Sequence, residues 1–111
     1  MFTKIKKFIS RSKNTMGEKA VFEIYRSFEM DDNTAVICGT VKSGKFRTGD
    51  KVMVCGIKRR KIKLEGIIKK ITTALVEVNN ISSGYETDIL IEKTKDRKLL
   101  IFPGDRAYKV Q

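Results

Sequence analysis

The stretch AVICGTVKSGKFRTGDKVMV, from Ala35 to Val54, constrains the fold of this chain more than any other, because apolar runs alternate there with regularly spaced glycines. Glycine adopts positive φ at little steric cost, so Gly44 predicts a hairpin turn within Lys42–Lys45. Gly39 lies inside an apolar run and predicts a β-bulge or a close backbone contact. The frame G-x-V-x-x-G-x-x-x-x-G-D consists of Gly39, Val41, Gly44, Gly49 and Asp50, all predicted to be structural.

Short alternating runs separated by turns continue along the chain and predict an all-β fold. In the run that follows the glycine frame, Ile62, Leu64 and Ile68 share one strand face, and Gly66 predicts a bulge or bend. We expect a closed Greek-key β-barrel of about six to seven strands, preceded by a short amphipathic helix or arm. The predicted strands cover Val21–Phe28, Thr34–Lys42, Lys45–Arg47, Lys51–Ile57, Arg60–Ile68, Thr72–Val78, Tyr85–Glu92, Leu99–Phe102 and Ala107–Val110, with a loop at Asn79–Gly84.

The glycine frame closely resembles the second domain, a β-barrel, of translational GTPases such as elongation factor Tu, where TGxVxxGxxxxGD precedes an apolar strand. The resemblance extends more weakly over Val21 to Val110. The family usually closes this domain with RGD and an apolar pair, whereas this chain has FPGDRAYKV. The resemblance implies a stand-alone barrel over residues 20–111, with residues 1–19 as a separate basic segment. In that family the domain touches ribosomal RNA and, in elongation factor Tu, helps to hold the aminoacyl end of transfer RNA.

The charge of the chain favours a polyanionic partner, because 24 Lys and Arg against 13 Asp and Glu give a net charge of +11. Basic residues concentrate between positions 42 and 63. On a strand, Arg59, Lys61 and Lys63 would project from one face at ~6.6 Å intervals and could follow a phosphate backbone. The alternative is a solvated face that keeps the barrel soluble. The predicted nucleic-acid-binding residues are Lys42, Lys45, Arg47, Lys58, Arg59, Arg60, Lys61 and Lys63.

The aromatic residues predict core packing more than base stacking, since they form no cluster typical of an RNA-binding sheet. Tyr25 and Tyr85 are the two that could reach the surface. The turn Asp31–Asn33 predicts side chains that bond their own backbone, because it lacks the later glycine and glutamate of a calcium loop. The aromatic residues expected in the core are Phe22, Phe28, Phe46, Phe102 and Tyr108.

The segment MFTKIKKFISRS places Phe2, Ile5, Phe8 and Ile9 at helical spacing, with basic residues largely on the other face. Three functions fit this pattern: a protein-docking helix, an anchor to an acidic membrane surface, and a basic arm for nucleic acid. A fourth interpretation is a helix that covers one end of the barrel.

No pattern typical of an active site occurs in the sequence. It has no histidine, no C-x-x-C pair, no nucleophile elbow and no phosphate-binding loop, so we expect no enzyme activity, metal, cofactor or small-molecule substrate. Cys38 and Cys55 lie in strand-like runs and are expected to be reduced and buried. The lysine-rich chain without a signal peptide predicts a cytoplasmic protein.

The sequence therefore predicts a small non-catalytic module that contacts RNA or a ribonucleoprotein such as the ribosome through a basic barrel face. A second hypothesis is a protein or membrane-surface adaptor that uses the amphipathic segment at residues 2–9. A third is an accessory domain to a separate enzyme. Deleting residues 1–17 separates the first two, because only the adaptor hypothesis predicts a loss of binding.

Overall fold

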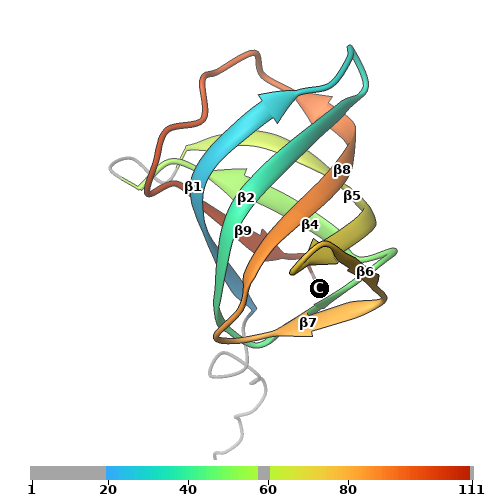
Figure 1. Cartoon of the computed structure of the whole chain (residues 1–111). Helices are drawn as coiled ribbons and strands as arrows, with labels where there is room; N and C mark the ends of the chain where they lie inside the picture. The colour runs from blue at the N-terminus through green and yellow to red at the C-terminus, as the bar shows by residue number, and fades with distance from the viewer. Residues whose placement is uncertain (1–19, 58–60, 111) are drawn as a thin grey trace, which may run out of the picture.

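Nine strands make up the described part of the chain, residues 20–57 and 61–110 of a computed structural model (Figure 1). The amphipathic positions Phe2, Ile5, Phe8 and Ile9 lie outside these residues, as do Lys58, Arg59 and Arg60. The strands are β1 (Val21–Glu29), β2 (Thr34–Ser43), β3 (Lys45–Arg47), β4 (Lys51–Cys55), β5 (Ile62–Thr73), β6 (Val76–Val78), β7 (Asn80–Ser82), β8 (Glu86–Asp96) and β9 (Arg106–Lys109).

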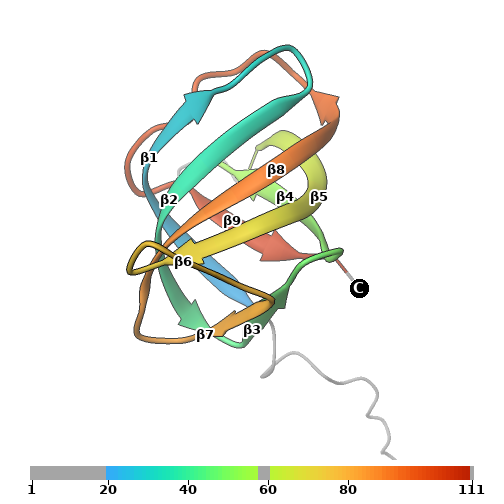
Figure 2. The same cartoon turned by 45° about the vertical axis from the view of Figure 1, so that its right-hand side comes forward.

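The predicted closed barrel is confirmed. Six antiparallel strands follow one another in the order β4-β9-β1-β2-β8-β5, and β5 pairs with β4 to close the circle. Strand β6 extends the sheet beyond β5, while β3 and β7 form a separate two-stranded ribbon (Figure 2). Among the described residues the structure has no helix.

The core fills the inside of the barrel, because alternate side chains of each strand point inward. Phe22 and Phe46 meet edge to face with ring centroids 6.2 Å apart, as expected for core aromatics. The prediction is wrong for Phe28, which is 47% exposed. The register of β1 against β2 shifts between Ile24 and Arg26, so the residues beyond the shift change faces.

Two further aromatic predictions differ from the structure. Phe102 is 54% exposed because residues 99–102 form no strand and cross the outside of the barrel instead. Tyr108 is half-buried on the outer face of β9, where it pairs with Met53 of β4. Tyr25 and Tyr85 are exposed, as the sequence suggested.

Two glycines inside strands mark bulges, as predicted. A Cβ atom at Gly39 would overlap the carbonyl oxygen of Glu23 on β1. A Cβ at Gly66 would overlap the side chain of Ile91, and the register of β5 against β8 shifts between Glu65 and Gly66. These positions exclude larger side chains because neighbouring strands approach closely where the sheet bends.

The predicted hairpin at Lys42–Lys45 is wrong, although Gly44 has the expected positive φ of 74°. Strand β2 pairs with β1 and β8, whereas β3 pairs with β7, so the chain turns a corner there. A Cβ at Gly44 would lie 2.6 Å from the Cα of Ala20. The corner directs β3 away from the barrel wall and starts the ribbon.

The expected strand Thr72–Val78 is also interrupted. Ala74 and Leu75 have positive φ values of 51° and 67° and form the tight turn between β5 and β6. The expected loop at Asn79–Gly84 contains β7, whose middle residue, Ile81, is buried. Burial of Ile81 therefore explains why the second segment forms a strand, whereas Leu75 in the turn is 98% exposed.

Both cysteines are free, and the Cys38 thiol has a raised pKa. Partial burial, together with hydrogen bonding and repulsion from the Asp88 carboxylate, raises the pKa of Cys38 to about 11. Strand pairing places Asp88 directly opposite Cys38 on the outer face of β2 and β8. The thiol is therefore protonated at neutral pH, and its nucleophilicity is low.

We expect iodoacetamide to alkylate Cys38 on the order of a hundredfold more slowly at pH 8 than an unperturbed thiol, because the thiolate fraction falls by that factor. Asp88→Asn removes the carboxylate charge and should accelerate the reaction. Site-resolved mass spectrometry of the labelled protein measures both rates. Equal rates in the two proteins would contradict the role of Asp88.

Candidate nucleic-acid interface

The ribbon of β3 and β7 presents a basic surface without an acidic side chain. Its register pairs Lys45 with Ser82 and Arg47 with Asn80, so these four side chains share one face. All four residues are exposed, whereas Phe46 and Ile81 point to the core between them. We call Lys45, Arg47, Asn80 and Ser82 the ribbon face.

The turn after β3 holds the ribbon against the barrel. The Asp50 carboxylate accepts a 2.8 Å hydrogen bond from the backbone N–H of Arg47 and lies 3.3 Å from the Lys109 ammonium group. Gly49, with φ of 94°, donates its N–H to the carbonyl oxygen of Ile68 in β5 at 2.7 Å. Gly49 and Asp50 thus connect the turn after β3 to β5 and to Lys109.

The cations of the ribbon face have no acidic partner in the described structure. Lys45 and Arg47 form no ion pair there, while Lys42, at the end of β2, pairs with Glu23 at 3.3 Å on the surface. Lysine, arginine, asparagine and serine side chains all donate hydrogen bonds to phosphate oxygens. The ribbon face can therefore bind phosphate groups spaced along a backbone.

Among the other predicted residues that the structure describes, Lys61 and Lys63 lie away from the ribbon face. Lys61 comes just before β5, and Lys63 is the second residue of that strand. Strand β5 begins beside the end of β4 that is remote from the ribbon (Figure 2). Lys61 is exposed, but the expected exposure of Lys63 is wrong, since its side chain is 11% exposed. The predicted nucleic-acid-binding residues that the structure describes therefore lie at two ends of the barrel.

Lys63 is buried because residues 97–105 cross the outer face of β5 at this point. Its ammonium group donates hydrogen bonds to the Asp105 carboxylate at 2.6 Å and to the Leu100 carbonyl oxygen at 2.7 Å. It also lies 4.6 Å from the centroid of the Phe102 ring. The charge of Lys63 is compensated within the protein, so it contributes little to an external phosphate site.

Sequence reasoning missed Asn80 and Ser82. The pattern N-I-S alternates one apolar residue with two polar residues, which is a period of two. A run of three residues inside a polar segment carries too little signal to separate a strand from a loop. The pairing partner β3 supplies the missing information.

The acidic turn between β1 and β2 behaves as the sequence predicted. The Asp31 carboxylate accepts hydrogen bonds from the backbone N–H groups of Asn33 and Thr34 at 2.7 and 2.9 Å. These bonds and one from the Thr34 hydroxyl lower the pKa of Asp31.

In the described residues no cluster of three potential ligands could hold a metal ion. The same residues include no helix long and apolar enough to span a membrane.

Comparison with solved structures finds the same fold in translation elongation factor SelB from Methanococcus maripaludis. The apo form superposes with a TM-score of 0.67 at 16% identity, over 84% of this chain and 19% of that one. The form with the GTP analogue GppNHp gives a TM-score of 0.69 at 14% identity, over 93% of this chain and 21% of that one. No protein-family model and no curated protein matches the sequence.

This chain thus corresponds to about a fifth of the SelB chain. The structural match confirms the resemblance to a β-barrel domain of translational GTPases. At these identities it establishes the fold alone.

Proposed function

We propose that this chain is a non-catalytic module that binds RNA or a ribonucleoprotein through the ribbon face. The observation that carries the proposal is the pairing of Lys45 and Arg47 with Ser82 and Asn80 on one exposed face without a carboxylate. Lys42 at the adjoining end of β2 adds a partly compensated charge. Binding by this surface reads the phosphate backbone and not the base sequence.

The comparison with SelB supports the proposal at the level of fold. The matched barrel belongs to a translation elongation factor, and the resemblance to translational GTPases implies contact with ribosomal RNA. This chain spans a fifth of that protein, so the proposal transfers neither its GTP binding nor its partners. The net charge of +11 provides a second, independent reason for a polyanionic partner.

The test measures the affinity of the full chain for a structured RNA hairpin before and after removing two ribbon charges. The variant Lys45→Gln/Arg47→Gln should weaken binding about tenfold or more, since each lost charged contact costs on the order of 1 kcal/mol. Fluorescence anisotropy with labelled hairpin reports the dissociation constant.

The matched control is Lys95→Gln/Arg97→Gln, which makes the same two substitutions at the opposite end of the barrel. Lys95 and Arg97 are exposed and, like the ribbon cations, have no ion pair within the described residues. If both variants lost RNA affinity equally, the loss would follow from the lower net charge alone, and this result would contradict a ribbon site. Deletion of residues 1–17 should leave binding largely intact, whereas its loss would move the site to the amphipathic segment.

A further inference from the structure

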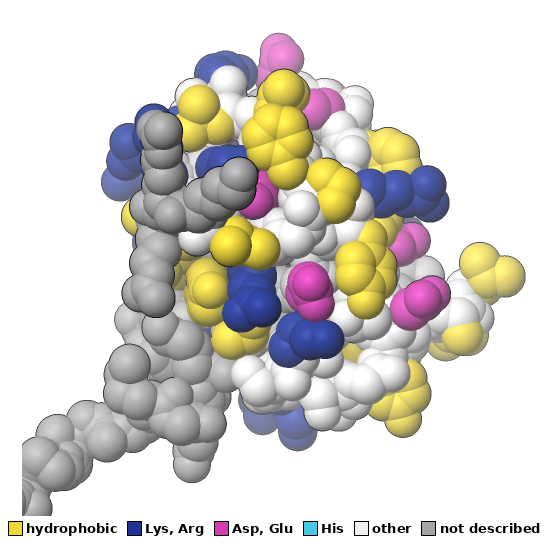
Figure 3. All heavy atoms as spheres, turned by 90° about the vertical axis from the view of Figure 1, so that its left-hand side faces the viewer, with side chains coloured by type: hydrophobic (Ala, Val, Ile, Leu, Met, Phe, Trp, Pro, Cys, Tyr) yellow, Lys and Arg dark blue, Asp and Glu magenta, His cyan; other side chains and the backbone are white. Residues whose placement is uncertain are grey.

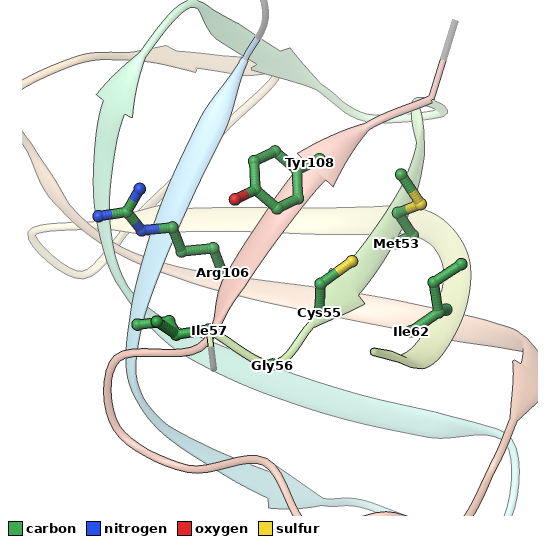
Figure 4. A pocket seen from close by; sticks show the side chains of 7 residues that line it. All are labelled: Met53, Cys55, Gly56, Ile57, Ile62, Arg106 and Tyr108. Carbon is green, nitrogen blue, oxygen red and sulfur yellow. The ribbon is translucent and has the colours of Figure 1, made fainter. Parts of the chain in front are cut away.

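A hollowed apolar surface lies at the end of β4 that is remote from the ribbon. Two adjoining hollows of about 550 and 510 Å³ flank Gly56 and Ile57. The first lies between β4 and β9 and includes Met53, Arg106 and Tyr108 (Figure 4). The second lies between Ile57 and Phe102. We call the two hollows together the β4 groove.

Several large apolar side chains around the groove are exposed to solvent. Ile57 is 53% exposed and Phe102 54% exposed, and the neighbouring Leu100 is 74% exposed. Figure 3 shows this side of the molecule, with hydrophobic side chains gathered over it and both basic and acidic side chains between and around them. Exposed apolar side chains grouped in this way within a charged surround mark an interaction surface.

The wall of the groove is fixed before any partner binds. The Asp105 carboxylate accepts hydrogen bonds from Lys63 at 2.6 Å and from the backbone N–H of Phe102 at 2.9 Å. The backbone N–H of Asp105 in turn donates to the Phe102 carbonyl oxygen at 3.0 Å. A preformed wall lowers the ordering cost of binding.

The groove also contains cations that the protein does not compensate. The Nε of Arg106 is buried and has no hydrogen-bond partner, and its guanidinium group forms no ion pair with the described residues. Lys61 lines the second hollow and likewise has no ion pair in the described structure. Of the acids at the groove, Asp105 is paired with Lys63, and Glu65 lies opposite Met53 in the adjoining strand. Because Arg106 lines the first hollow without a charge partner among the described residues, its guanidinium group favours an acceptor supplied from outside.

We propose that the β4 groove binds an acidic, apolar segment of a partner protein. The apolar side chains of the partner segment would fill the two hollows, and a carboxylate of that segment would accept hydrogen bonds from Arg106. Arg106 and Lys61 line the hollows and have no ion pair with the described residues. Charge complementarity therefore selects a negatively charged segment.

Three other occupants fit the groove less well. Residues 1–19 contain six basic residues against one acidic residue, so the amino-terminal segment has the same sign of charge as the groove. RNA bases stack on exposed aromatic faces, whereas the Phe102 ring already carries the Lys63 ammonium group 4.6 Å from its centroid and Tyr108 is half-buried. A lipid surface favours side chains that protrude, whereas these line hollows.

A display library of random 12-residue peptides, selected against the full chain, provides the probe. We expect enrichment of peptides that combine Asp or Glu with large apolar residues. For the best selected peptide, synthesised and labelled, Arg106→Gln and Ile57→Ser should each weaken binding about tenfold. Tyr85→Ser, a substitution of an equally exposed residue on another part of the barrel, should leave it unchanged.

Urea unfolding of each variant verifies that the fold is retained. Because Arg106→Gln and Ile57→Ser are separate proteins, the effect of each substitution on peptide affinity is measured on its own. Selection without acidic enrichment, or affinity that neither groove variant changes, would overturn the proposal. So would tighter peptide binding after deletion of residues 1–17, which would identify that segment as the occupant. Groove-dependent binding to phosphatidylserine vesicles or to the RNA hairpin, with no peptide selected, would equally overturn it. As a further control, Lys45→Gln/Arg47→Gln on the ribbon face should leave the affinity for the peptide unchanged.

Discussion

Replacing Gly39 with alanine is expected to lower the free energy of unfolding by about 3 kcal/mol or more, a large fraction of the stability of a typical domain. The added Cβ would overlap the carbonyl oxygen of Glu23, which belongs to the backbone of the paired strand. A backbone atom cannot move aside without breaking the β1–β2 ladder at its bulge. Urea unfolding followed by circular dichroism measures the loss.

The control is Gly84→Ala, because Gly84 also resists substitution but for a different reason. It has a positive φ of 100°, yet an added Cβ would have no atom within 4 Å of it. Backbone strain alone should cost about 1–2 kcal/mol. If Gly39→Ala were no more damaging than Gly84→Ala, the close approach of β1 and β2 would be refuted.

Breaking the buried pair of Lys63 and Asp105 is the second change with a large expected effect. Asp105→Asn leaves the Lys63 ammonium without its charge partner, and Lys63→Met leaves the Asp105 carboxylate alone in a site where 7% of its side chain is exposed. Each single change should cost about 3 kcal/mol at neutral pH. Urea unfolding again supplies the free energies.

The double variant Lys63→Met/Asp105→Asn should lose much less than the sum of the two single losses, because neither charge then remains buried alone. Lys69→Met serves as the surface comparison, since the pair of Lys69 with Glu92 is about half exposed and should contribute under about 1 kcal/mol. Additive losses would show that the two side chains act independently, contrary to the 2.6 Å contact.

Much of the barrel could be predicted because glycine and alternation report local geometry. The frame residues Gly39, Gly44 and Gly49 mark a bulge, a corner and a turn, and each constraint acts within a few residues. Pairing is different, since it joins distant segments. The corner at Gly44 looked like a hairpin because sequence does not show that β3 pairs with β7.

The candidate site was predictable only in part for the same reason. Alternation placed Lys63 on the outer face of β5 correctly, but it does not show that residues 97–105 cover that face. It also identified Lys45 and Arg47 as outward residues while leaving Asn80 and Ser82 in a loop. Charge spacing predicts one strand, whereas a binding surface depends on which strands become neighbours.

The salt dependence of RNA binding tests the central claim most directly. For wild type and the variant Lys45→Gln/Arg47→Gln, the affinity for the same RNA hairpin is measured between low and moderate salt. If the ribbon face binds phosphates, the slope of log affinity against log salt should be shallower in the variant by about 1.4 to 1.8, one counterion term for each lost contact. Identical slopes for the two proteins would contradict RNA binding by the ribbon face.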